Sequence, residues 1–215
     1  MATIMAAALP GHYVGPERCQ TWADSSEEVH MGFHHVALAT RDTAATHEFY
    51  TNVMGFRLVK VVAAPTPGEH GGWSKHFFYS TDSAGDGADS GMIAFWEIHD
   101  TEIGTDFPVD INTTAGLPWW VNHIAFDAPT LADLHRHRDR WRSHGHHVLE
   151  VDHEFCVSIY IRDPSANMVE FCHTTRAFTP DEIELSNAML LQAKPDFNGH
   201  ANALVHEPIP QPANA

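Results

Sequence analysis

The stretches HHVALATRDTAATHEFYTNVMGF, residues 34–56, and NHIAFDAPTLADLHRHRDRWRSHG, residues 122–145, share one pattern. In each, the second residue is His and belongs to a short apolar strand, an Asp follows, and an amphipathic helix comes next. The same sequence of elements in two places indicates an internal duplication, and the fold class expected for the chain is α+β.

The later strands of the two copies also match. The segments FFYSTD (77–82) and SGMIAFWE (90–97) parallel SIYIRDP (158–164) and ANMVEFC (166–172). The chain is therefore predicted to consist of paired βαβββ modules that form a curved mixed sheet. This alignment sets Ala94 opposite Glu170, so only one of the two equivalent carboxylate positions is filled.

Strand parity predicts a common face for three polar residues. Side chains alternate along a strand, so His35 shares a face with Ala37, while Val36 faces the other way. By the same rule His123 shares a face with Ala125, and Glu170 lies opposite Val169 and Phe171. The branched and aromatic residues are expected under the helices, and the polar residues in the concave hollow.

Two imidazoles and one carboxylate are a known ligand set for a divalent metal that keeps open coordination positions. Any single His on an apolar strand is more often structural, because imidazole is only intermediate in burial and can bond to the backbone. The joint placement of His35, His123 and Glu170 at matching points of two modules favours a metal site.

This arrangement resembles the vicinal oxygen chelate superfamily, which includes glyoxalase I, methylmalonyl-CoA epimerase, fosfomycin-resistance proteins and type I extradiol dioxygenases. The resemblance covers roughly residues 32–174. Within it, HEFCVSIYIRDPSANMVE, residues 153–170, looks like the extradiol signature, with Tyr160, the Asp163-Pro164 turn and Glu170 in register. Ala166 departs from that signature, which has Gly or Pro at this point.

The ligand pattern places the chain nearest to the extradiol branch. Glyoxalase I-like proteins tend to supply four ligands, two from each module, whereas extradiol enzymes use the two first strands and the final Glu. With Ala94 in the vacant place, the resemblance implies Fe(II) held by His35, His123 and Glu170. It further implies a catechol-like diol, dioxygen, and ring opening beside the diol.

The resemblance also implies roles near the metal. His153 would hydrogen-bond a substrate oxygen or transfer a proton, and Tyr160 would steady the oxygens at the metal. Many extradiol enzymes have a further His just before the last strand of the preceding module, but here that neighbourhood reads DSGM, residues 89–92. His76 or His34 is the candidate substitute, and a His34-His35 pair resembles the hydroquinone-cleaving relatives.

Three functions stay open at this point. The leading hypothesis is an Fe(II) extradiol-type dioxygenase acting on a catechol- or hydroquinone-like aromatic. The second is a redox-silent lyase, isomerase or epimerase using Mn(II), Zn(II), Ni(II) or Co(II). The third is a non-catalytic ligand-binding module. Metal identity and oxygen use separate the three.

Composition restricts the partners. The 215 residues carry 12 Lys and Arg against 28 Asp and Glu, a net charge of −16, which argues against nucleic acid or an anionic membrane. A small organic substrate fits better. No apolar run approaches a membrane span, no secretion signal is evident, and three Cys without CxxC spacing favour a reducing cytoplasm. Paired-module proteins of this size often dimerise, so a homodimer is expected.

The predicted organisation is an N-terminal arm (1–31), a first module (32–100), a connection (101–120), a second module (121–178), and a C-terminal helix with its tail (179–215). In the connection, Trp119 and Trp120 either close over the pocket or fill core, and core filling is the expectation. His135 and His137 are expected on the solvated face of the helix in the second module. The loop GDGADSG, residues 85–91, lacks the Lys of a phosphate-binding loop.

Overall fold

The computed structural model describes residues 33–66, 68–82, 91–199 and 201–210. Its elements, in chain order, are β1 (His35–Ala39), α1 (Thr43–Glu48), the π-helical turn η1 (Phe49–Val53), β2 (Arg57–Pro65), β3 (Gly72–Ser80), β4 (Met92–Asp100), β5 (His123–Asp127), α2 (Leu131–Ser143), β6 (Val148–Asp152), β7 (Cys156–Arg162), β8 (Met168–Thr174), α3 (Pro180–Leu190) and β9 (Asn202–His206). The predicted N-terminal arm and most of the GDGADSG loop lie outside the described residues.

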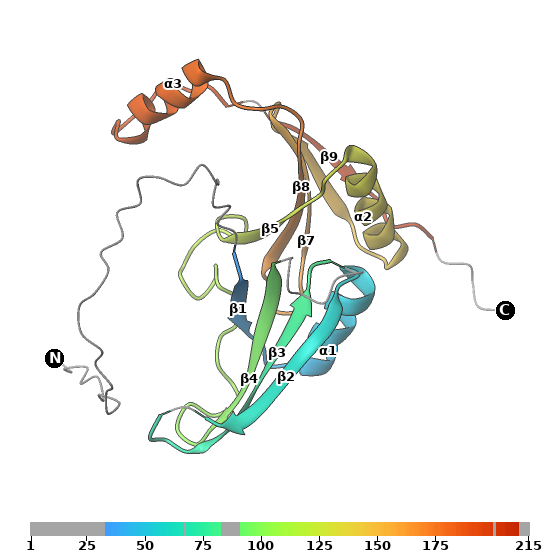
Figure 1. Ribbon diagram of the computed structural model, residues 1–215, viewed down its shortest axis with the longest axis vertical. Coiled ribbons are helices and arrows are strands. Elements are labelled where there is room, and N and C mark those ends of the chain that lie inside the picture. Colours follow the sequence, from blue (N-terminus) through green and yellow to red (C-terminus); the bar gives the residue numbers. More distant parts are fainter. Residues whose placement is uncertain (1–32, 67, 83–90, 200, 211–215) are drawn as a thin grey trace, which may run out of the picture. The chain divides into compact units, whose positions relative to one another are not determined.

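Each module forms its own mixed sheet (Figure 1). The first has the strand order β1-β4-β3-β2, and the second has the order β5-β8-β7-β6-β9. In both sheets the first strand pairs in parallel with the last strand of its module, and the other neighbours are antiparallel. The α+β class and the duplicated modules are confirmed. The predicted curved mixed sheet consists of two sheets, one of four strands and one of five, and among the described strands no ladder joins β1 to β5.

The strand register confirms the internal alignment. Ala94 on β4 is the Cα partner of Ala37, and Glu170 on β8 is the Cα partner of Ala125. The two positions are thus equivalent in their modules, as the sequence predicts. A methyl group occupies the place in the first module that a carboxylate occupies in the second.

One apolar core contains residues of both modules. Tyr50 and Phe95 pack at a ring-centroid distance of 4.6 Å within the first module, and Phe56 meets Phe126 across the module boundary at 4.9 Å. Leu38, Ile124 and Phe126 are partly buried against this core. The faces opposite the histidines therefore pack inward, which leaves His35 and His123 exposed on the other face of their strands.

The C-terminal region contains the predicted helix and one additional strand. Thr179 caps α3 in a capping box with Glu182, and Pro180 occupies its first turn, so the predicted C-terminal helix is confirmed. The sequence analysis missed β9, which pairs antiparallel with β6 through Val148↔His206 to Asp152↔Asn202. Its apolar run, residues 203–205, is too short to stand out within a tail rich in Pro and Asn.

Two expectations about large side chains are wrong. Trp119 and Trp120 are 46% and 57% exposed, so they do not fill core. The buried amide of Asn112 instead holds this turn, donating to the carbonyl oxygens of Trp119 at 2.9 Å and Asn122 at 2.8 Å. His137 is half-buried rather than on a solvated face, because its ring stacks on Phe171 at a centroid distance of 3.7 Å. None of the helices within the described residues is long and apolar enough to cross a membrane.

Candidate functional site

His123 and Glu170 meet on the second sheet. Nε2 of His123 lies 3.2 Å from Oε2 of Glu170, although the two residues come from different strands, β5 and β8. The Glu170 side chain is 6% exposed, whereas that of His123 is 39% exposed. A buried carboxylate with an accessible imidazole beside it is unfavourable for stability alone. The arrangement is typical of a functional position.

A second polar pair adjoins the first, formed by Tyr160 on β7 and His153 in the turn between β6 and β7. Tyr160 is the Cα partner of Glu170, and its ring centroid lies 6.4 Å from that of His123. Its hydroxyl lies 3.2 Å from Nε2 of His153, so Tyr160 and His153 are hydrogen-bonded. Burial, together with the nearby charge of Glu170, raises the pKa of Tyr160 well above its usual value. The phenol is therefore protonated at neutral pH and available as a donor.

The turn between β7 and β8 holds Glu170 in place. Asp163 accepts from the backbone N–H of Asn167 at 2.8 Å, and its carboxylate also accepts from the hydroxyl of Tyr50 at 3.1 Å. Tyr50 belongs to the first module, so this bond links the modules. Ala166 has a φ of 66°, a left-handed conformation that Gly adopts without strain and that residues with a Cβ rarely adopt.

The other predicted residues gather on the first sheet. Nδ1 of His35 lies 2.8 Å from Nδ1 of His34, and the ring of His35 lies 6.0 Å from that of His76. His76 stacks on Trp96 at 4.0 Å with an angle of 12° between the rings. Burial, and then the proximity of His35, lowers the pKa of His76. His34, His35 and His76 therefore form a second cluster, on the first sheet.

The structure brings together two of the three predicted metal ligands. In the described part of the chain, no group of three His, Cys, Asp or Glu residues is arranged to hold a metal ion, and no recorded contact joins His35 to His123 or Glu170. The pair itself fits a divalent ion. Neighbouring donors bound about 2.1 Å from one ion lie roughly 3 Å apart, close to the observed 3.2 Å. The role of His35 stays a prediction.

Cys156, beside the site, is unsuited to act as a nucleophile. Cys156 is buried and its sulfur lies 4.0 Å from the hydroxyl of Ser158. Burial, followed by the interaction with Cys172, raises the pKa of Cys156 to about 12. A thiol with this pKa is almost entirely protonated at neutral pH, whereas the thiolate is the reactive form.

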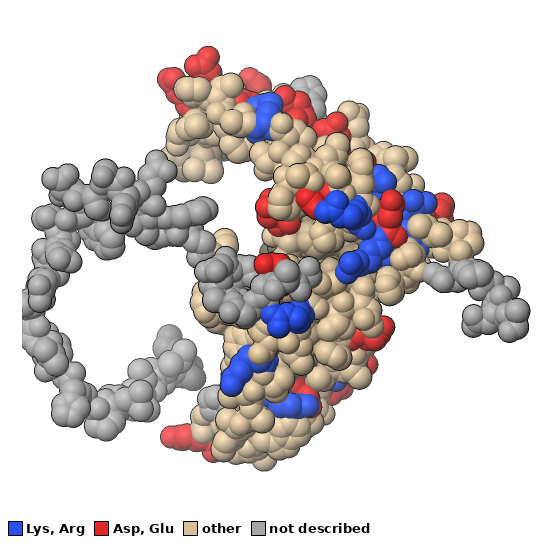
Figure 2. Space-filling model, turned by 45° about the vertical axis from the view of Figure 1, so that its right-hand side comes forward, with Lys and Arg blue, Asp and Glu red and all other residues tan. Residues whose placement is uncertain are grey.

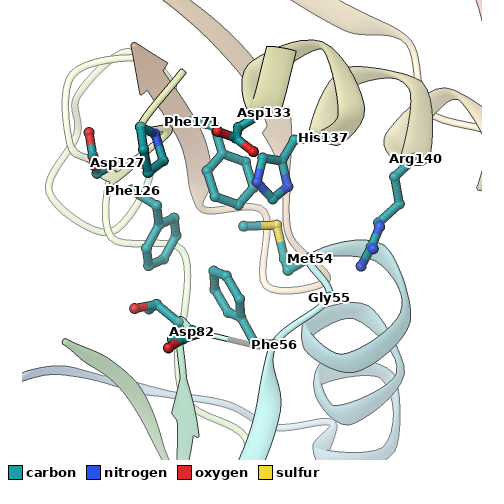
Figure 3. A pocket seen from close by; sticks show the side chains of 12 residues that line it. Met54, Gly55, Phe56, Asp82, Phe126, Asp127, Asp133, His137, Arg140 and Phe171 are labelled. Atoms are coloured by element: carbon teal, nitrogen blue, oxygen red, sulfur yellow. The ribbon is translucent and has the colours of Figure 1, made fainter. Parts of the chain in front are cut away.

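A separate cavity of about 440 Å³ lies where the two modules meet (Figure 3). Its walls include Phe56 from the first module and Phe126 and Phe171 from the second. At the side where Figure 3 places Arg140, the guanidinium lies against Gly55, whose φ is 80°. None of the predicted site residues lines this cavity, so it belongs to module packing rather than to the candidate site.

Charged side chains on α2 are paired. Figure 2 shows blue and red side chains next to one another on the described surface. On α2, Arg136 pairs with Asp133, and Arg142 pairs with Asp139 at 3.3 Å. Arg138 pairs with Asp139 at 3.1 Å and with Glu150 on β6 at 3.3 Å, so arginines of this helix neutralise carboxylates both on α2 and on the second sheet.

Comparison with known families decides the classification. Residues 32–171 match the family described as Glyoxalase/Bleomycin resistance protein/Dioxygenase superfamily. The chain belongs to this superfamily. The match spans both modules, so the superfamily resemblance expected from the duplicated histidines is confirmed. It does not single out the extradiol branch. A search of proteins with curated descriptions found no match.

Solved structures of superfamily proteins resemble the fold. A glyoxylase/bleomycin resistance protein/dioxygenase domain from Frankia sp. EAN1pec is 16% identical, with 69% of this chain and 95% of that chain covered and a TM-score of 0.48. A lactoylglutathione lyase from Agrobacterium tumefaciens is 21% identical (68% and 96% covered, TM-score 0.42). The fosfomycin resistance protein FosX from Listeria monocytogenes is 16% identical (72% and 98% covered, TM-score 0.45).

Members of the superfamily bind divalent metals, and a FosX variant from Listeria monocytogenes was crystallised with Mn(II).

Proposed function

We propose that this protein is a divalent-metal-dependent enzyme, an extradiol-type dioxygenase that opens the ring of a catechol- or hydroquinone-like aromatic. The observation that carries the proposal is the contact between Nε2 of His123 and the buried carboxylate of Glu170 at 3.2 Å. Beside this contact stands the hydrogen-bonded pair of Tyr160 and His153. Donors for a metal and groups for proton transfer thus adjoin each other on one sheet.

His35, His123 and Glu170 would hold the metal, with Fe(II) favoured. When bound, such an ion supplies Lewis acidity to two vicinal oxygens and a position for dioxygen. In this proposal His35 completes the ligand set from the first module. On β1 it occupies the strand position equivalent to that of His123 on β5. Mn(II), Zn(II), Ni(II) and Co(II) are compatible with the same donors.

The chain's own groups would orient the substrate and move its protons. Tyr160 is a hydrogen-bond donor, and its contact with Nε2 of His153 fixes where that imidazole lies. Imidazole titrates near neutral pH, which suits the removal of a proton from a substrate hydroxyl. His34 lies against His35 and is the candidate for the proton-transfer role that the DSGM segment does not supply.

A redox-silent lyase or isomerase is the second candidate. The observation that favours it is again the pair of Tyr160 and His153, because a hydrogen-bonded phenol and imidazole beside a metal can shift protons without dioxygen. Oxygen consumption separates the two classes, and a ligand-binding module would show neither reaction.

The test combines metal analysis with oxygen uptake. Anaerobically purified protein should contain a stoichiometric divalent metal, and His35→Ala, His123→Ala and Glu170→Ala should each remove it. His173→Ala is the matched control, because His173 lies on β8 but bonds to the backbone oxygen of Ala128 at 2.9 Å; this variant should retain the metal. Full occupancy in His123→Ala would refute the metal assignment.

The reaction is tested on the Fe(II)-loaded protein with a panel of catechols and hydroquinones. Oxygen should be consumed with formation of a ring-opened product. His153→Asn should keep the metal and lose turnover by about 100- to 10,000-fold if it transfers a proton, or about 10- to 100-fold if it only orients groups. Interconversion of a hemithioacetal or an acyl-CoA without oxygen uptake would establish the second candidate instead.

A further inference from the structure

A hollow on the histidine face of the first sheet is lined by small and apolar side chains. Ala37 and Ala39 on β1, with Trp96 and Ile98 on β4, border a cavity of about 490 Å³. A smaller cavity of about 120 Å³ adjoins it, with Ser74 and Trp96 common to both. Small residues on β1 and a large aromatic on β4 leave room for a flat molecule.

Three polar atoms in this hollow are buried without a hydrogen-bond partner. They are Oγ1 of Thr66, Oγ of Ser74 and Nε2 of His76. Ser74 is the most enclosed, at 2% exposure. A buried polar group that lacks a partner is destabilising by about 1–3 kcal/mol, and such groups are uncommon in native proteins. Thr66 lines the larger cavity, His76 lines the smaller one and Ser74 lines both, so a ligand that spans the two cavities would supply the missing partners.

The charges at the hollow select against anions. No Lys or Arg is among the described residues that line the two cavities. The imidazole of His70 lines the larger one, but it lies 3.4 Å from the carboxylate of Asp100, whose side chain is 2% exposed, so this histidine is already paired with an anion. Asp100 accepts from the backbone N–H groups of Glu102 and Ile103, both at 2.8 Å. Because a buried anion needs a cationic partner, a carboxylate or phosphate group would be unfavourable here.

We propose that this hollow binds a neutral, flat, oxygen-substituted ring system. Its hydroxyl or carbonyl groups bond to Ser74, His76 and Thr66, and its ring packs against Trp96 and Ile98. This inference deepens the proposed function, on which it rests for the identification of the ligand as substrate. His76 is then a specificity residue, held in position by its stack on Trp96, rather than the proton donor that the sequence allowed.

The position of the hollow joins recognition to the proposed chemistry. The ring of His76 lies 6.0 Å from that of His35, so a ligand bonded to His76 extends toward a proposed metal ligand. Neutral catechols and hydroquinones would be accepted, and substrates with an anionic group beside the ring would be rejected. The substrate class is therefore an uncharged aromatic diol that carries a further ring or apolar substituent.

Three probes of one shape test the recognition separately from turnover. Binding of 1-naphthol, 1-naphthoate and naphthalene to EDTA-treated full-length protein would be measured by titration calorimetry. We expect 1-naphthol to bind at least about 10-fold more tightly than either of the others. Equal or tighter binding of 1-naphthoate, or binding of no probe, would overturn the inference. Because no metal or oxygen is needed, failure of the dioxygenase proposal leaves this result interpretable.

Two serines on the same strand provide matched variants. Ser74→Ala should weaken 1-naphthol binding by about 3- to 10-fold, the effect of one hydrogen bond, leave naphthalene binding unchanged, and melt no lower than the parent protein. Ser80 is also buried on β3, but its hydroxyl bonds to the backbone oxygen of Asp82 at 3.0 Å. It lies six residues away, roughly 20 Å along the strand.

Ser80→Ala should therefore lower the melting temperature and leave 1-naphthol binding unchanged. If Ser74→Ala binds 1-naphthol as tightly as the parent, or if both serine variants weaken it equally, the hollow is not the binding site.

Discussion

Replacing Glu170 with Gln should change the stability of the protein in opposite directions with and without a divalent metal. Gln keeps the shape of the side chain and removes its charge. The prediction addresses the central residue of the proposed site, and its measurement requires no knowledge of the substrate.

The expected magnitude follows from the burial of the carboxylate. The Glu170 side chain is 6% exposed, and its recorded ion-pair partner is His123, which is 39% exposed. A buried ion recovers only part of its lost hydration from one ion-pair partner. Replacing a whole buried ion pair by apolar residues is often stabilising by about 1–4 kcal/mol, whereas removing one member is destabilising when the other charge stays buried. His123 can return to water. In EDTA, Glu170→Gln should therefore be more stable than the parent, by about 1 kcal/mol.

With a bound metal the parent should be more stable than Glu170→Gln. A ligand that binds only the folded state at a concentration of about 100 times Kd adds about 2.7 kcal/mol to the free energy of unfolding. The parent should gain this amount, and Glu170→Gln should gain almost none. The assay is urea unfolding followed by tryptophan fluorescence, in EDTA and with added metal.

Glu150→Gln is the matched control on the same sheet. The Glu150 carboxylate bonds to His206 at 2.9 Å and to Arg138 at 3.3 Å, so its two partners make it structural. The control should be less stable than the parent in both conditions and should keep the metal-dependent gain. If Glu170→Gln is less stable than the parent in EDTA, as Glu150→Gln is expected to be, the functional assignment of Glu170 is wrong. It is also wrong if Glu170→Gln keeps the metal-dependent gain in the free energy of unfolding.

Two further predictions concern stability alone. Burial, and next the charge of Arg140, lowers the pKa of His137 to about 4. As the pH falls, the unfolded chain therefore binds a proton at this histidine before the folded protein does. The free energy of unfolding present above pH 6.5 should fall by about 1–2 kcal/mol, after allowance for solvent, as the pH drops toward 4. Urea unfolding from pH 7.5 to 4 should show a smaller loss in His137→Phe, and an equal loss would contradict the assignment. Gly72→Ala should lower the free energy of unfolding by more than about 2 kcal/mol, because φ is 100° and a Cβ would overlap the carbonyl of His99. Gly55→Ala should lower it by only about 1–2 kcal/mol, since only the flexible end of the Arg140 side chain must move. Equal melting of the two glycine variants would argue against this reading.

The sequence by itself determined the faces of the strands and the equivalence of the two modules. Alternation along a strand is local, so the grouping of His35 with Ala37 and of His123 with Ala125 follows from neighbouring residues. The match of Ala94 to Glu170 also follows, because the duplicated pattern repeats the register. Helix starts are local as well, and the Thr before Pro180 marks α3 correctly.

Only the tertiary structure decided which distant groups meet. The contact of His123 with Glu170 and the burial of His137 against Phe171 depend on how sheets and helices pack over long separations. The same holds for Trp119, which its hydrophobicity assigns to the core although the side chain of Asn112 fixes the turn. The unpartnered hydroxyl of Ser74 is also a property of the packed sheet. Periodicity specifies the face on which a residue lies, but packing against the rest of the chain determines what that face meets.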